Sequence, residues 1–333
     1  MLLRYVLRRL LIMIPTVIIA SMLIFAVMEL PPGDYFETYA AQAQASGEPA
    51  ELSRVEFMKK EYGFDRGPIG RYLFWVEGLL HGDFGYSFEY QMPARDVVGD
   101  RLLLTMLVSI VTTLFTWIVA FPIGIYSATH QYSWTDYTLT FLGLLGIAVP
   151  HFLLALMFMY AANVWFGTSV GGLMDPQYIN APMSFDKFMS ILSHLWIPVI
   201  VIGAGGTGGL IRRLRANLLD ELQKQYYVTA KAKGLGPMRA LVKYPLRMSL
   251  NFFVSDIGDV LPSIVSGAEL TAIVLSLQTV GPLLVHALRS QDMYLAGSLL
   301  MFLSFLSMVG VLISDIALAF LDPRIRFTGG STK

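Results

Sequence analysis

The sequence predicts an all-α integral membrane protein with six transmembrane helices. Of its 333 residues, 55% are hydrophobic and only 14% are charged, whereas about a quarter of the residues of an ordinary soluble domain are charged. A helix that crosses the hydrocarbon core of a bilayer needs roughly 20 mostly apolar residues. Five stretches meet this requirement without an acid, lysine or arginine: residues 10–28, 102–129, 137–174, 188–211 and 293–314.

A sixth span is predicted over about residues 250–280, and it differs from the others because it contains acids. Asp256 and Asp259 share a helical face because they are three residues apart, whereas Glu269 is rotated well away from them. Ionisable side chains inside a span are costly and usually face a cavity or a partner. These three acids and Asp315 are therefore candidate intramembrane polar groups. A proton relay and structural pairing between helices would both explain them.

The first apolar stretch is predicted to be a retained membrane helix. Basic residues precede it, which is also the layout of a signal peptide. The apolar run is long, however, and it leads into "MELPPGD" and not into a small-residue cleavage site.

The distribution of charges predicts which loops face the cytoplasm. Residues 34–100 contain twelve acidic against six basic residues, whereas residues 212–247 contain nine basic against two acidic residues. Basic loops stay on the cytoplasmic side of a membrane, and both ends of the chain are also basic. Both termini are therefore predicted to be cytoplasmic, which requires an even number of spans.

These boundaries divide the chain into four predicted parts. Residues 1–30 hold the N-terminal segment and first helix, residues 31–100 form an extracytoplasmic segment, residues 101–321 form the transmembrane core with a cytoplasmic loop at about 212–249, and residues 322–333 form a cytoplasmic tail. Within the extracytoplasmic segment, "AAQAQASGEPAELSRVEF" predicts a polar linker followed by a short helix that ends at Gly63. We expect a small lid or docking surface there and not a catalytic domain.

The cytoplasmic loop is predicted to contain two short helices. Val228, Ala232 and Leu235 recur at the spacing of one apolar helical face. Gly234 then permits a tight turn, and Pro237 suits the first position of a second helix.

A basic stripe is predicted on the second of these helices, because Arg239, Lys243 and Arg247 follow one another at intervals of four. Such a stripe can be a solvated face held near anionic lipid headgroups. It can also belong to a pair of short helices that docks on a cytoplasmic partner. The pattern alone leaves both interpretations open.

Three glycines in "IPVIVIGAGGTGG", namely Gly203, Gly205 and Gly208, have the spacing of a dinucleotide-binding turn. That site requires a strand–helix–strand unit whose second strand ends in an acid. The nearest downstream acid, Asp220, instead lies within a continuing helical pattern. The glycines are therefore predicted to let transmembrane helices approach closely.

The sequence predicts no catalytic, cofactor-binding or metal-binding residues. It has no cysteine, which excludes disulfides and zinc–thiolate sites. It has no Gly-Lys dipeptide, so a phosphate-binding loop with its lysine is absent, and any ATP must be bound by another chain. An intramembrane enzyme would need a nucleophile with a base or a metal cluster, and neither is visible. The five histidines are scattered without metal-ligand spacing: His81, His130, His151, His194 and His286.

Six segments, taken in order, resemble the dipeptide, oligopeptide and nickel permease family of binding-protein-dependent ABC importers. They are "LLRYVLRRLLIMIPT" with "PPGD", "RYLFWVEGLLHGDFGYSF", "SWTD", "VPHF", "YYVTAKAKGL" and "LDPRIRF". The resemblance extends nearly from end to end. It implies a type I ABC importer permease fold with an extracytoplasmic insertion after the first helix.

The resemblance also implies a role for the cytoplasmic loop. Permeases of this class carry a Glu-Ala-Ala loop, with a glycine four residues after the second alanine, that forms a coupling helix in a groove of the ATPase. When Gly234 is aligned with that glycine, only Ala230 matches the triplet, but "TAKAKG" is similar to the "TARAKG" typical of the peptide branch. Leu246 matches the loop's leucine, whereas Tyr244 and Arg247 depart from the general pattern. The implied ATPase-coupling residues are Tyr227, Val228, Thr229, Ala230, Lys231, Ala232, Lys233, Gly234, Leu235 and Leu246.

The resemblance implies the membrane-spanning subunit of an ATP-driven importer in the plasma (inner) membrane, and not an enzyme. Its implied partners are a second homologous permease, two ATPase chains that bind ATP and Mg, and an extracytoplasmic solute-binding protein, without nucleic acid. "LSLQTVG" stands where relatives often have an aromatic residue followed by Pro-Gly, which leaves the solute open between peptides, oligosaccharides and other polar solutes. The alternative function is an ion-coupled secondary transporter that uses the intramembrane acids.

Overall fold

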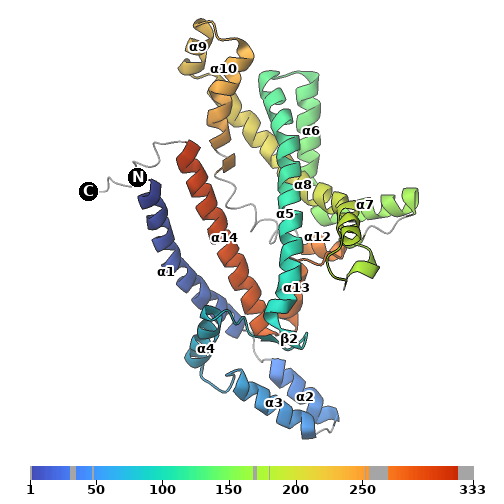
Figure 1. Cartoon of the computed structure of the whole chain (residues 1–333). Helices are drawn as coiled ribbons and strands as arrows, with labels where there is room; N and C mark the ends of the chain where they lie inside the picture. Colours follow the sequence, from blue (N-terminus) through green and yellow to red (C-terminus); the bar gives the residue numbers. More distant parts are fainter. Residues whose placement is uncertain are drawn as a thin grey trace. The chain divides into compact units, whose positions relative to one another are not determined.

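A computed structural model of the chain describes residues 2–30, 35–46, 49–167, 171–179, 181–251, 253–254 and 269–321. The chain divides into two compact units. Unit 1 contains Thr105–Gln278 and Val309–Lys333 together with the first two residues, and unit 2 contains Leu3–Leu104 and Thr279–Met308. The described residues are mostly helical, as the sequence predicts (Figure 1).

Unit 2 holds the N-terminal helices and one small hairpin. Its elements are α1 (Leu2–Glu29), α2 (Tyr35–Ser46), α3 (Pro49–Glu61), α4 (Pro68–Leu80), β1 (Tyr86–Ser87), β2 (Met92–Pro93) and α13 (Val280–Arg289). Two long helices, α5 (Ala94–Thr129) and α14 (Met293–Leu321), contribute residues to both units.

Unit 1 holds the remaining helices. They are α6 (Trp134–Ala148), α7 (His151–Phe166), the 3₁₀ turn η1 (Pro176–Tyr178), α8 (Phe185–Leu222), α9 (Gln225–Ala232), α10 (Pro237–Lys243) and α12 (Glu269–Val274). Residues 245–251 form a further helical stretch directly after α10.

Four helices of the described residues are long and apolar enough to cross a membrane by length and composition: α1, α5, α8 and α14. They correspond to the first, second, fourth and last of the predicted spans. The third predicted span, residues 137–174, is divided into α6 and α7, which are bent by 102° and could together make a fifth span. The chain is therefore a multi-pass membrane protein.

Pro150 accounts for the break between α6 and α7. A residue before proline is driven out of the helical conformation by the proline ring, and Val149 is extended, with φ −87° and ψ 125°. Helix α7 then ends at Phe166, before the predicted limit of the span, because Gly167 adopts the left-handed conformation with φ 61°.

The predicted span that contains acids, at about residues 250–280, falls largely outside the described residues. Asp256 and Asp259 lie there, as does the side chain of Glu269. The described part corrects the end of this span, because α12 stops at Val274 and the chain turns before α13 begins at Val280. The total of six spans stays a prediction.

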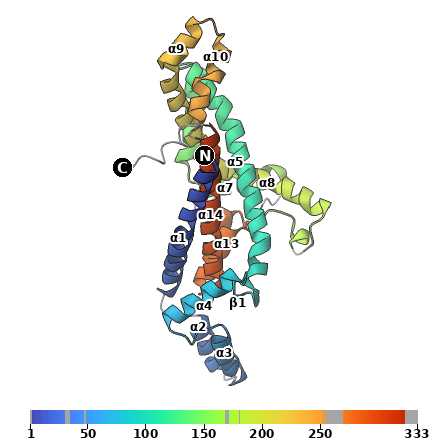
Figure 2. The ribbon, with the colours of Figure 1, turned by 60° about the vertical axis from the view of Figure 1, so that its left-hand side comes forward.

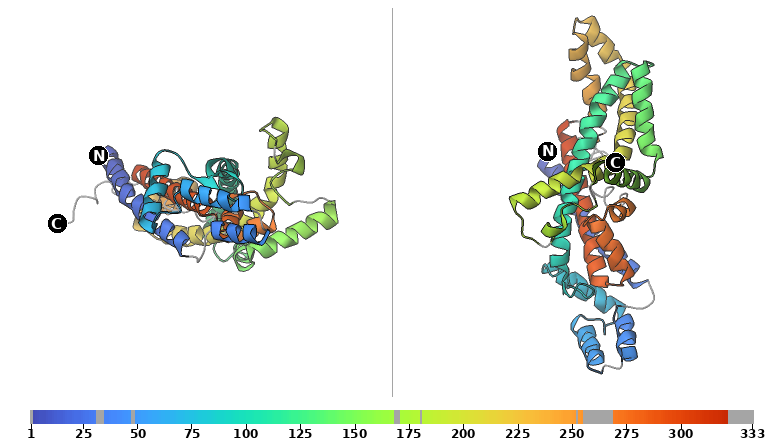
Figure 3. Two further views of the ribbon diagram at one scale, coloured as in Figure 1. Left: turned by 90° about the horizontal axis from the view of Figure 1, so that it is seen from below. Right: turned by 90° about the vertical axis from the view of Figure 1, so that its right-hand side faces the viewer.

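The segment between α1 and α5 has a hydrophobic core of its own. The predicted polar linker is wrong in part, because its alanine-rich half belongs to α2, which lies beside α3 (Figures 1 and 3). Phe36 of α2 is fully buried, with its ring centroid 4.5 Å from that of Phe88 and 4.9 Å from that of Phe64. Helix α3 ends at Glu61, close to the predicted stop at Gly63, whose φ is 74°.

A buried carboxylate ties the β1–β2 hairpin to the start of α14. Asp292 accepts hydrogen bonds from the Ser87 hydroxyl at 2.6 Å and from the backbone N–H groups of Glu89 at 3.2 Å and Leu295 at 3.3 Å. Burial raises the pKa of Asp292, and the three donors oppose that shift. The hairpin is thereby held against the beginning of a membrane-spanning helix.

Helices α6 and α8 touch backbone to backbone, and glycines make this contact possible. A Cβ atom on Gly208 of α8 would overlap the carbonyl oxygen of Gly143 of α6, and one on Gly146 would lie 2.7 Å from the carbonyl oxygen of Ala204. Figure 3 shows the two helices side by side. The sequence prediction of close helix packing is confirmed for Gly208.

We expect Gly208→Ala to destabilise unit 1, because the added methyl group must force α6 and α8 apart. Overpacking of this kind costs about 1–3 kcal/mol. Thermal unfolding of the purified protein in detergent measures the effect. Gly209→Ala is the matched control, because no atom lies within 4 Å of a Cβ at that position. Equal unfolding midpoints for the two variants would contradict the close contact.

Candidate coupling site

The predicted turn between two short helices is present after α8. Helix α9 ends at Ala232, Gly234 has φ 83°, and Pro237 occupies the first turn of α10. The N–H of Leu235 donates to the carbonyl oxygen of Ala230 at 3.2 Å, which closes the end of α9. We call α9 and α10 the coupling pair; Figures 1 and 2 show it beyond the end of α8.

The coupling pair has a small buried interior. Tyr227, Ala230 and Ala240 are buried, and Leu235 and Tyr244 are partly buried against them. The predicted apolar face is shortened, because α9 ends at Ala232 and Leu235 lies beyond it; Val228, 51% exposed, and Ala232, also exposed, remain on that face. The face that packs on α10 contains Tyr227 and Ala230, which are three residues apart.

The coupling pair is also joined to the helices that precede it. Leu241 of α10 packs against Leu218 of α8 and Ala128 of α5 in one buried cluster. The Tyr226 hydroxyl donates a hydrogen bond to the Glu221 carboxylate at the end of α8. Burial and this carboxylate raise the pKa of Tyr226 above that of an ordinary tyrosine. The coupling pair is therefore in contact with both α8 and α5.

The outer surface of the coupling pair is both apolar and basic. Val228, Met238 and Val242 expose 51%, 69% and 53% of their surfaces. The charged side chains exposed near them are Lys231, Lys233, Arg239 and Lys243. The coupling pair therefore exposes both apolar and basic side chains to a partner.

The predicted basic stripe is corrected in one respect. Helix α10 ends at Lys243, the chain changes direction at Tyr244, and Arg247 lies on the following helical stretch. Arg239, Lys243 and Arg247 are all exposed, but they do not share one helix.

Each of the ten implied coupling residues lies in or next to the coupling pair. Tyr227 and Ala230 are buried, and Leu235 and Leu246 are partly buried. The others are exposed: Val228, Thr229, Lys231, Ala232, Lys233 and Gly234.

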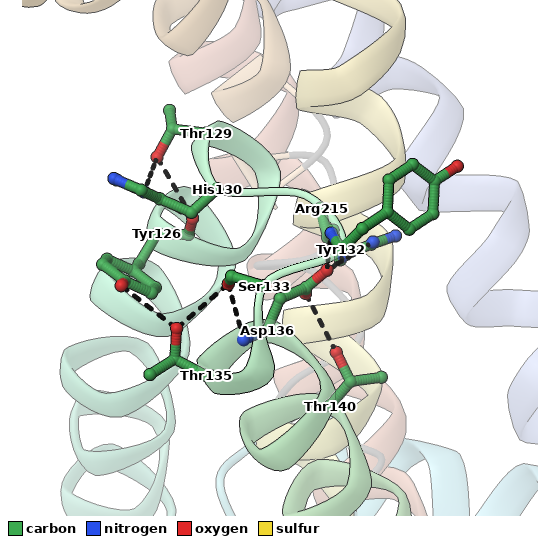
Figure 4. A network of polar contacts seen from close by, with 9 residues as sticks. All are labelled: Tyr126, Thr129, His130, Tyr132, Ser133, Thr135, Asp136, Thr140 and Arg215. Atoms are coloured by element: carbon green, nitrogen blue, oxygen red, sulfur yellow. Dashed lines mark hydrogen bonds and ion pairs between the residues drawn. The ribbon is translucent and has the colours of Figure 1, made fainter.

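A buried ion pair that sequence reasoning missed fixes α8 on α6. Asp136, in the first turn of α6, is 1% exposed. The Arg215 guanidinium of α8 donates to both of its carboxylate oxygens, from Nε at 3.0 Å and from a terminal nitrogen at 2.8 Å (Figure 4). This two-point geometry sets the orientation of the two groups as well as their distance.

The remaining hydrogen-bonding capacity of Asp136 is also used. The Tyr132 N–H donates to the carboxylate at 3.1 Å and the Thr140 hydroxyl at 3.3 Å. Ser133 caps the helix by accepting a hydrogen bond from the Asp136 N–H at 3.1 Å (Figure 4). The signal in the sequence was a lone aspartate at the start of an apolar helix, but its partner is 79 residues away.

Of the four candidate intramembrane acids, the structure describes only Asp315 fully. It is partly buried in α14, next to Ser314, whose hydroxyl donates to the carbonyl oxygen of Val254 at 2.6 Å. Among the described residues no group of three potential metal-ligating side chains could hold a metal ion. Gly203, Gly205 and Gly208 all lie inside α8, which excludes the dinucleotide-binding turn.

The described residues combine several membrane-spanning helices with an exposed pair of short helices. Residues 120–327 match the family described as binding-protein-dependent transport system inner membrane component, and the chain belongs to this family. The resemblance inferred from its motifs is confirmed. The chain is the permease, the membrane component of a transport system.

Two relatives show how far this similarity extends. The oligopeptide transport system permease protein AppB of Bacillus subtilis is 31% identical over 328 residues, which cover 97% of this chain and 99% of that protein. The dipeptide transport system permease protein DppB of Escherichia coli K12 is 29% identical over 341 aligned positions, with 97% and 99% coverage.

We expect Arg215→Ala to destabilise the protein by about 3–5 kcal/mol, because it leaves the Asp136 carboxylate buried without its counter-charge. The double variant Asp136→Ala, Arg215→Ala should be less destabilised than Arg215→Ala alone. Thermal unfolding in detergent measures both, and Arg212→Ala, an exposed arginine of the same helix, is the control. Additive losses in the double variant would show that the two residues are not coupled.

Proposed function

We propose that this permease forms half of the translocation pathway of an ATP-driven importer for peptides or similar-sized polar solutes, oligosaccharides included. The names of the relatives, which specify oligopeptide and dipeptide transport, support the peptide assignment. The observation that carries the proposal is the exposed coupling pair at the end of a membrane-spanning helix. A short helix pair with an apolar and basic surface suits a cytoplasmic protein partner.

On this proposal the working transporter contains three kinds of component besides this permease. A second, homologous permease completes the pathway, two ATPase chains bind ATP and Mg and hydrolyse the ATP, and a solute-binding protein delivers the solute. The complex lies in the plasma (inner) membrane, with both chain ends, residues 322–333 and loop 212–249 in the cytoplasm. Residues 31–100 lie outside and help to receive the binding protein.

Transport would be driven through the coupling pair. Closure of the ATPase dimer on ATP moves the pair, and the contact of Leu241 with Leu218 and Ala128 transmits this movement to α8 and α5. The spanning helices then expose the pathway outward, and hydrolysis resets them. Each step shifts a balance between two conformations of the complex.

We expect Gly234→Val to uncouple ATP hydrolysis from transport while the protein still inserts in the membrane. Valine is strained at the positive φ of this position, so the turn between α9 and α10 should open. Solute uptake and ATPase activity of the reconstituted complex measure the coupling. Gly236→Val is the matched control, because Gly236 has φ −58° and open space around its Cβ position.

Two outcomes would contradict the proposal. Normal uptake and normal copurification of the ATPase with Gly234→Val would remove the coupling role of the turn. Wild-type uptake that survives ATP depletion but collapses with an ion gradient would favour the alternative, a secondary transporter that uses the acids Asp256, Asp259, Glu269 and Asp315.

The proposed topology predicts opposite labelling of two single cysteines in this cysteine-free chain. A membrane-impermeant thiol reagent applied to intact cells, or to spheroplasts where an outer membrane excludes it, should label Gln44→Cys, an exposed position of α2. It should label Met238→Cys, in the coupling pair, only after permeabilisation. The reverse pattern would overturn the assignment of sides.

A further inference from the structure

Helix α4 has an apolar surface wider than the protein covers. Tyr72 and Trp75 face the inside of unit 2, and Trp75 is only 3% exposed. A second set of apolar side chains on the adjoining face is open: Ile69 is 78% exposed, Leu73 58% and Leu80 82%. Spacings of four and seven residues place these three on one side of the helix.

Contacts with α1 place α4 beside the last two turns of a membrane-spanning helix (Figures 1 and 2). The Tyr72 hydroxyl lies 3.0 Å from that of Ser21, and the rings of Phe25 and Trp75 have centroids 6.1 Å apart. The ion pair between Glu29 and Arg71, at 2.8 Å, marks the end of α1.

These contacts show how far α4 reaches along α1 from its end at Glu29. Ser21 and Glu29 are eight residues apart, which is about 12 Å along a helix. The apolar stretch of α1 includes Ser21 and ends just before Glu29. Helix α4 therefore contacts α1 within the outer half, about 15 Å, of a hydrocarbon core about 30 Å thick.

The exposed surface of α1 at the same level is apolar. Leu23 is 61% exposed and Val27 is 53% exposed. The open face of α4 is apolar in the same way. Glu77, which flanks that face, lies in the last turn of α4 next to the exposed His81.

We propose that α4 is an interfacial anchor helix that lies in the outer leaflet of the membrane and presents Ile69, Leu73 and Leu80 to lipid. Helices of this type bury their apolar face about 5–10 Å into the boundary between headgroups and acyl chains. The anchor fixes the base of the extracytoplasmic segment at the membrane surface. The inference depends on the proposed topology only for the choice of leaflet, and it is independent of the solute and of ATP coupling.

Spin labels on single cysteines test this proposal in the assembled transporter reconstituted in lipid nanodiscs. Oxygen concentrates in lipid and a nickel chelate in water, so their collision rates with a label report its surroundings. We expect labels at Leu73→Cys and Leu80→Cys to collide more with oxygen than with nickel. Leu23→Cys on α1 is the lipid reference, and Gln44→Cys on α2 is the water reference.

Two results would overturn the proposal. Collision rates like those of Gln44→Cys would show that this face of α4 is in water. Low collision rates with both reagents would show that another protein subunit covers the face. Because the labels report position and not transport, neither result depends on the proposed function.

Discussion

The arrangement of unit 1 depends on the buried ion pair between Asp136 and Arg215. Removing two charges from water is costly, and their attraction offsets that cost only if the remaining hydrogen-bonding capacity is also satisfied. Here the Tyr132 N–H and the Thr140 hydroxyl complete the shell of the carboxylate. The pair therefore acts less as a source of net stability than as a constraint, because a shifted α8 would leave a buried charge without its partner.

The ion pair lies on α8, the helix that leads into the coupling pair. The glycine contact between α6 and α8 prevents the two helices from separating without a loss of backbone packing, and the ion pair prevents them from sliding. Two residues separate Leu222 from the start of α9 at Gln225, and Leu241 of α10 returns to pack on Leu218. The coupling pair is thus packed on α8 and α5, which is the contact through which we propose that it acts.

Local signals predicted the local structure well, and non-local contacts explain the errors. Gly234 and Pro237 specify their turn by backbone conformation alone, so the coupling pair could be read from the sequence. Which side of α9 is buried depends on the position of α10, and the spacing of Val228 and Ala232 therefore did not reveal that Tyr227 is buried. The helix that contains the alanine-rich segment packs Phe36 on Phe88, and Asp136 pairs with Arg215, which is 79 residues away. Neither partner could be identified from one sequence.

The central claim is that the exposed surface of α9 and α10 contacts an ATPase chain. Photo-crosslinking amino acids at Met238 and Val242, both largely exposed, test it directly in the complete transporter in membranes. The account predicts adducts between the permease and the ATPase at both positions, and none from a crosslinker at Gln44 in the extracytoplasmic segment. Adducts with lipid alone at Met238 and Val242, or no adducts in a complex that still transports, would contradict it.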